Sequence, residues 1–367
     1  MSSFAIYRLP HAEECTFIEQ TEGEPEQLRS CRELNNRTGF VFAPFQITSD
    51  CPLLLIRPNR ITHLQVGDFS QLDETVDLRH RHDTPCDDVS FSAKRNQYRE
   101  DFTLFHQELC AHHFEKLVLS RCASIPISAS NGNTNTPIQL FQRACEYYPR
   151  LFICLVSTPK SGTWLAATPE ILLEGKEKQW RTIALAGTMR LEGDGLQGEG
   201  EQSTWSTKNI QEQRYVGKYL TEQLKPFVSQ LHEEGPRTVR AANLVHLRSD
   251  FTFTLLNNVR VGDLLQALHP TPAVCGLPKD EAFSFILSNE HTQRQYYSGF
   301  MGPLAIPHPT SPNTHLYVSL RCMQITATHY RLYAGGGLLK DSIEEQEWQE
   351  TEAKMETMRQ LIEKNHV

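Results

Sequence analysis

The chain has 367 residues, of which 39% are hydrophobic and 22% charged, as in ordinary globular proteins. Its net charge of −8 argues against a nucleic-acid-binding or anionic-membrane-binding surface. The ten cysteines include no C-x-x-C pair, and no apolar run is long enough for a membrane span. We therefore expect a soluble, cytoplasmic protein with reduced thiols and no metal–thiolate site.

Residues 1–92 contain short apolar runs, at 39–45 and 53–56, separated by polar and proline-containing stretches. These runs predict strands and turns without a chemical signature. The spacing of apolar residues over 98–113 then predicts an amphipathic helix. A strand is expected over residues 114–121.

Lys116 projects from a face of that strand that is otherwise apolar, beside Phe114 and Val118. Such a lysine either extends to the edge of the sheet or is buried for a purpose. Burial lowers the pKa of a lysine because it disfavours the charged form, and a lysine that acts as a general base needs this. Both interpretations stay open from this segment alone.

Glu170 follows the turn set by Thr168-Pro169 and begins the apolar strand Ile171-Leu-Leu173. An acid at the start of a strand is usually solvated. If it is instead held against apolar side chains, its pKa rises and it can act as a proton donor.

Two helices place acidic residues on or beside a buried face. The first is expected over residues 207–232, with Glu212 inside its apolar stripe and Asn209 at the edge. The second follows three glycines, and Glu347 and Glu350 border its apolar stripe. A solvated face with an i, i+4 pair between Glu350 and Lys354 is the alternative for the second helix. A buried carboxylate needs a cation, and carboxylates from two helices without His or Cys favour Mg²⁺, completed by water and substrate.

Arg321 lies in the middle of a strand expected over residues 316–325. An arginine there is most often paired with a structural carboxylate. Beside a pocket it is a clamp for a substrate carboxylate instead.

Taken together, these segments resemble the chorismate-utilising enzymes over roughly residues 95–362. Each sequence block alone is weak evidence for the family, but the presence of all of them in this order makes the resemblance specific. The blocks are Lys116-Leu-Val-Leu-Ser-Arg121, Thr168-Pro-Glu-Ile-Leu-Leu173, Leu185-Ala-Gly-Thr188, Lys208-Asn-Ile-Gln-Glu212, Leu268-His-Pro-Thr-Pro-Ala273, Arg294-x-x-Tyr297-x-Gly299, Leu320-Arg321-Cys322, Tyr333-Ala-Gly-Gly-Gly337 and Glu347-x-x-Glu350-Thr-x-x-Lys354.

The resemblance implies an α+β fold with two stacked antiparallel sheets and outer helices. Residues 1–92 would supply N-terminal strands that match loosely, and residues 93–367 the chorismate-binding catalytic region. Mg²⁺ would lie between the helix of Glu212 and the helix of Glu347 and Glu350. Asn209 departs from the family, which usually has an acid at this position, so the site loses one negative charge.

The resemblance also implies the residues that bind substrate. Arg321 and Lys354 would hold the enolpyruvyl carboxylate, while the ring carboxylate would bind Mg²⁺. The remaining wall is expected to consist of Gly187, Thr188, His269, Thr271, Ala273, Tyr297, Gly335, Gly336 and Gly337.

Within this family, a lysine at the position of Lys116 resembles the isochorismate and salicylate synthases, which have a lysine there and activate water. Anthranilate synthase has a glutamine there and uses ammonia. Glu170 would protonate the departing C4 hydroxyl. The loop at 269–273 resembles isochorismate synthases of the menaquinone or siderophore type, so we expect that activity, with a salicylate, anthranilate or aminodeoxychorismate synthase as alternatives. We expect a monomer without a glutaminase subunit.

Overall fold

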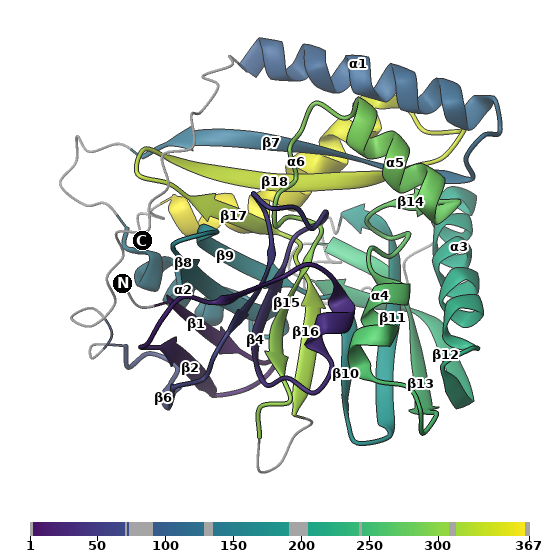
Figure 1. The fold of residues 1–367 in the computed structure, drawn as a ribbon. Helices are drawn as coiled ribbons and strands as arrows, with labels where there is room; N and C mark the ends of the chain where they lie inside the picture. Colours follow the sequence, from purple (N-terminus) through teal and green to yellow (C-terminus); the bar gives the residue numbers. More distant parts are fainter. Residues whose placement is uncertain are drawn as a thin grey trace.

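The computed structural model describes residues 3–69, 72, 91–127, 135–190, 205–241, 244–307 and 313–363. Within them the strands form two nine-stranded sheets, whose paired strands run antiparallel (Figure 1). Sheet A has the order β14-β7-β18-β17-β9-β8-β1-β2-β6, and sheet B the order β12-β13-β11-β10-β16-β15-β4-β5-β3.

The strands of sheet A are β1 (Ser3–Arg8), β2 (Glu14–Gln20), β6 (Arg60–Gln65), β7 (Lys116–Pro126), β8 (Phe152–Thr158), β9 (Gly162–Thr168), β14 (Gly276–Leu277), β17 (Cys322–Ile325) and β18 (His329–Leu338). Those of sheet B are β3 (Glu26–Leu28), β4 (Gly39–Ala43), β5 (Leu53–Ile56), β10 (Ile171–Lys176), β11 (Gln179–Arg190), β12 (Val228–Ala241), β13 (Leu244–Leu255), β15 (Phe300–Leu304) and β16 (Thr314–Val318). The helices are η1 (Cys31–Leu34), α1 (Phe91–Cys110), α2 (Pro137–Tyr147), α3 (Thr207–Leu224), α4 (Val261–Leu268), α5 (Lys279–Asn289) and α6 (Glu344–Ile362).

The two sheets share an aromatic core. Phe42 of sheet B stacks on Tyr296 with 4.1 Å between ring centroids, and Trp164 of sheet A packs edge-on against Phe42. Helices cover the outer faces: α2 and α6 pack on sheet A, while α3 and α4 pack on sheet B. Strands such as β8 are therefore buried on both faces and have continuous apolar runs instead of alternation. The predicted α+β fold is confirmed.

Strands from the N-terminal part extend both sheets. In sheet A, β1 pairs with β8, and β2 and β6 follow outward. In sheet B, β4 pairs with β15, and β5 and β3 follow. The residues before α1 thus contribute to both layers. The predicted division at residue 92 stays a prediction.

The helix predicted over residues 207–232 is wrong after Leu224. Helix α3 ends at Leu224, and β12 begins at Val228. Pro226 lies between them, and a proline cannot donate the backbone hydrogen bond that a continuing helix requires. The helix predicted over 98–113 begins earlier, at Phe91, and ends at Cys110.

The single strand predicted over residues 316–325 is also wrong. It is two strands, β16 in sheet B and β17 in sheet A, so the intervening residues cross from one layer to the other. Arg321 lies in this crossing with a φ of 44°, which is uncommon for a residue with a side chain. From this crossing the Arg321 guanidinium contacts His246 of β13 in sheet B.

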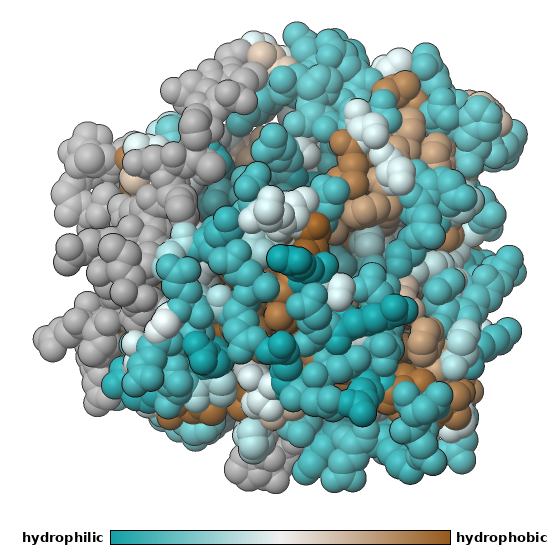
Figure 2. All heavy atoms as spheres, viewed as in Figure 1, coloured by the Kyte–Doolittle hydropathy of each residue, from teal (hydrophilic) through white to brown (hydrophobic). Residues whose placement is uncertain are grey.

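The face in Figure 2 is largely hydrophilic, with smaller hydrophobic areas. Few large hydrophobic side chains are exposed among the described residues: Ile61, Tyr147, Ile210, Leu256, Leu287 and Ile343. No helix in the described part of the chain combines the length and the apolar character needed to cross a membrane.

Candidate active site

A small cavity of about 70 Å³ brings together most of the residues predicted to bind substrate. Its walls come from β7, β11, β13, β18, α3, α6 and the crossing between β16 and β17. The predicted residues that line it are Glu170, Gly187, Thr188, Glu212, Ala273, Tyr297, Arg321, Gly335, Gly337 and Lys354.

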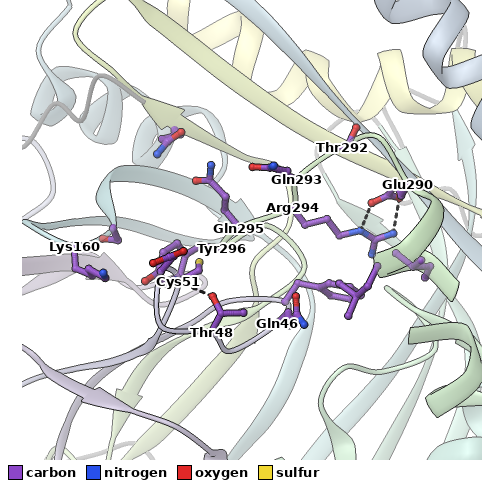
Figure 3. A pocket seen from close by; sticks show the side chains of 16 residues that line it. Gln46, Thr48, Cys51, Lys160, Glu290, Thr292, Gln293, Arg294, Gln295 and Tyr296 are labelled. Atoms are coloured by element: carbon purple, nitrogen blue, oxygen red, sulfur yellow. Dashed lines mark hydrogen bonds and ion pairs between the residues drawn. The ribbon is translucent and has the colours of Figure 1, made fainter. Parts of the chain in front are cut away.

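A larger cavity of about 600 Å³ lies elsewhere, and Figure 3 shows it from close by. Its lining includes Gln46, Thr48, Cys51 and Lys160, together with residues 292–296. None of the side chains predicted to do chemistry is among the described residues that line it. Two of the predicted acids, Glu170 and Glu212, and the cations Arg321 and Lys354 line the smaller cavity, so we place the active site there in spite of its volume.

Arg294, the first residue of the Arg294-x-x-Tyr297 block, is a structural anchor between the two cavities. Its guanidinium donates two 2.7 Å hydrogen bonds to Glu290 (Figure 3). It donates further hydrogen bonds to the carbonyl oxygens of Val118 and Val274. The Tyr297 N–H donates to the Arg294 carbonyl at 2.9 Å. Arg294 thereby fixes the loop that places Tyr297 in the smaller cavity.

Glu170 immediately precedes β10 and is only 3% exposed. Burial raises its pKa to about 8, although the charges of Lys116 and Lys354 act in the opposite direction. Its backbone is held by the N–H of Val318, which donates to the Glu170 carbonyl at 2.9 Å. At neutral pH the side chain therefore carries a proton next to the cavity.

Lys116, the first residue of β7, is completely buried. Its Nζ lies 3.0 Å from Oε1 of Glu212, which reaches in from α3 and lines the cavity. Burial alone would raise the pKa of Glu212, but the charges of Lys116 and then Lys208 hold it below its usual range. Both groups meet over Gly337: a Cβ there would lie 2.2 Å from Glu212 Oε1 and 2.9 Å from Lys116 Cε.

Gly187 sits at a bulge where the pairing of β11 with β13 shifts register, and its φ of 71° explains the glycine. Its N–H donates to Glu212 Oε2 at 3.2 Å. Its carbonyl oxygen accepts from His246 Nδ1 at 3.0 Å.

His246 lies on β13, lines the cavity, and was missed by the sequence analysis. Burial, then Arg321 and Lys354, hold its pKa well below the usual range, so the ring is neutral. With Nδ1 donating to Gly187, Nε2 accepts from the Arg321 guanidinium. A histidine inside the apolar run Leu244-Val-His-Leu247 was the available signal.

Glu347 and Glu350 lie on α6 beside Gly336, which precedes Gly337 in β18. A Cβ on Gly336 would be 3.2 Å from Glu347 Oε2 and 3.9 Å from Glu350 Oε1. Burial, then the neighbouring Glu350, raise the pKa of Glu347 to about 7. Glu347 pairs with Lys208 of α3, and Glu350 pairs with Lys354 at 2.7 Å.

These three carboxylates suit a hard divalent cation by their chemistry. Glu347 Oε2 is buried without a hydrogen bond of acceptable geometry, and the adjacent Glu350 raises the cost of ionising Glu347. However, no three His, Cys, Asp or Glu side chains within the described ranges already surround one point closely enough to hold a metal ion. One oxygen of each carboxylate pairs with a lysine, so Mg²⁺ stays a proposal.

Three other predicted residues lie away from the cavity wall. His269 Nε2 hydrogen-bonds the Pro44 carbonyl at 3.1 Å, and burial lowers the pKa of this ring to about 4. The Thr271 carbonyl accepts from the N–H groups of Val274 and Cys275, which shapes the loop. Asn209 Nδ2 donates to the Thr188 carbonyl at 3.5 Å.

A model of the family described as "Chorismate binding enzyme" matches residues 59–363. The chain therefore belongs to the chorismate-binding enzymes. Among curated relatives, isochorismate synthase MenF from Escherichia coli (strain K12) is 35% identical over 203 residues, which are 55% of this chain and 46% of that protein. Isochorismate synthase EntC from the same organism is 29% identical over 247 residues, or 66% of this chain and 61% of that protein.

The matched part is thus less than two thirds of either relative's length. The solved structure of MenF, the menaquinone-specific isochorismate synthase from Escherichia coli, covers 98% of this chain and 89% of its own, with a TM-score of 0.75. At 23% identity this likeness establishes a common fold.

Proposed function

We propose that this chain is an isochorismate synthase, which converts chorismate to isochorismate by adding water at C2 and releasing the C4 hydroxyl. One observation carries the proposal. A buried, protonated Glu170 lines one cavity together with two cations for carboxylates, Arg321 and Lys354. Glu212 lines the same cavity, and its Oε1 lies 3.0 Å from the Nζ of the buried Lys116. Relatives named isochorismate synthase support the same activity.

In the proposed reaction Lys116 takes a proton from the water that attacks C2, the ring double bonds shift, and the C4–O bond breaks. Glu170 gives its proton to the departing hydroxyl, which leaves as water. In this role Lys116 acts in its neutral form, and its Nζ lies 3.0 Å from Glu212 Oε1.

The hydrogen bond to His246 fixes the orientation of the Arg321 guanidinium before substrate binds. Lys354 donates to the Gly335 carbonyl at 2.9 Å and can turn toward a carboxylate. We propose Glu212, Glu347 and Glu350 as ligands of Mg²⁺, which when bound would supply positive charge for the ring carboxylate.

We also propose that the enzyme acts in the cytoplasm as a monomer. We propose that it has no glutaminase subunit, because water rather than ammonia is the proposed nucleophile. The negative net charge supports the expectation that nucleic acid is not a partner.

The test is an incubation with chorismate, with Mg²⁺ or with a chelator, followed by chromatography of the products. We expect a mixture of chorismate and isochorismate with Mg²⁺ and no conversion with the chelator. Pyruvate together with salicylate would identify a salicylate synthase. Anthranilate formed only when ammonia is added would contradict water as the nucleophile.

A further inference from the structure

Lys208 lies in the first turn of α3 and forms an ion pair with Glu347 of α6. The lysine side chain is 25% exposed and the glutamate side chain only 1%. Burial alone would lower the pKa of Lys208, but Glu347, then Glu350 and Glu212, raise it. This pair joins the two helices that carry the proposed metal ligands.

The cluster holds as many lysines as carboxylates. Each proposed ligand has a lysine partner, and the pairs are Lys116 with Glu212, Lys208 with Glu347, and Lys354 with Glu350. A divalent cation that enters such a cluster gains little attraction unless one ammonium group withdraws. The question is which lysine gives way.

The surroundings of the three lysines answer this. Lys116 is completely enclosed, and Lys354 has a second hydrogen bond, to the Gly335 carbonyl. Lys208 is a quarter exposed and, among the described residues, hydrogen-bonds only Glu347. It also lies at a helix N-terminus, where the helix dipole disfavours a cation. Lys208 is therefore the group that can turn to solvent at the lowest cost.

We propose that Lys208 competes with the divalent cation for Glu347 and thereby sets the metal affinity of the site. The inference rests on the proposed metal ligands of the previous subsection. It predicts that metal binding tightens when this ammonium is removed.

The experiment is calorimetric titration of Mg²⁺ into the protein without chorismate, repeated with Mn²⁺ followed by electron paramagnetic resonance. Lys208→Met should bind either ion about tenfold more tightly than wild type, a ratio that corresponds to about 1.4 kcal/mol. Lys208→Gln provides a second, polar variant, and thermal unfolding checks that each is folded. Lys218→Met is the matched control, since Lys218 lies on the same helix with a side chain that is 77% exposed.

Unchanged or weaker metal binding in both folded Lys208 variants would overturn the inference, because Lys208 would then position Glu347 instead of competing for it. If wild type still converts chorismate with Mg²⁺, only this inference fails. If neither wild type nor the variants bind Mg²⁺ or Mn²⁺, the metal ligands are also rejected.

Discussion

Glu170 has the pKa of a proton donor because of its position. Burial raises the pKa to about 8, so the acid keeps its proton below that pH and loses it as the pH rises further. We expect kcat/KM for chorismate to fall as the pH rises through about 8. Glu170→Gln should lose about 100- to 10,000-fold in kcat, because the amide cannot release a proton.

The measurement is a pH–rate profile of wild type and variant, with chorismate binding measured at each pH. An active Glu170→Gln variant that keeps the alkaline decline would assign that decline to another group. Unchanged binding in the variant is expected, since the substitution preserves shape and removes no charge at neutral pH.

Lys116 is the proposed base on the opposite side of the substrate. Lys116→Ala should lower kcat by about 100- to 10,000-fold and leave chorismate binding largely intact. Steady-state kinetics together with calorimetric binding distinguish these two effects. Turnover at the wild-type rate in Lys116→Ala would reject the role of general base.

At the scale of the element, the glycines of β18 leave room for side chains of neighbouring elements. In this strand Gly335, Gly336 and Gly337 leave room for Tyr297, Glu347 and Glu212, respectively. A side chain in this strand would displace the groups that lie against it.

Gly337→Ala places a methyl group 2.2 Å from Glu212 Oε1. We expect about a 100-fold loss of kcat, because a displacement of about 1 Å in an active site has an effect of that size. Gly217→Ala is the control: its added Cβ would make an ordinary 3.5 Å contact, and alanine favours a helix. The measurement is steady-state kinetics of both variants, with thermal unfolding to check that each is folded. A fully active Gly337→Ala variant would contradict this account.

Local patterns predicted several elements of the site correctly. Apolar neighbours at helix spacing placed Glu212 in a buried face, and its side chain is 12% exposed. For Lys116 and Glu170 the sequence left burial open, and both are buried. The same patterns failed at Arg321, where a continuous apolar run spans two strands of different sheets. Periodicity cannot distinguish a long strand from a crossing here, because Ser319 and Arg321 in the crossing are as buried as residues of the strands.

At the scale of the whole molecule, the tertiary structure determines which charged residues form ion pairs. Glu212 and Lys116 are far apart in the sequence, as are Glu347 and Lys208, and the stacked sheets bring each pair together. A single sequence contains no signal for such long-range pairs. This is why the carboxylates were predicted as metal ligands while their lysine partners were not, and why the link from His246 to Arg321 was missed.

The origin of the product hydroxyl tests the central proposal most directly. Chorismate is incubated with the enzyme and Mg²⁺ in water enriched in oxygen-18, and early isochorismate is analysed by mass spectrometry. Addition of water at C2 predicts one labelled oxygen in each new isochorismate molecule, and no labelled isochorismate with Lys116→Ala. Isochorismate that forms without the label would mean that the hydroxyl moves within the substrate, which would contradict a lysine that activates water.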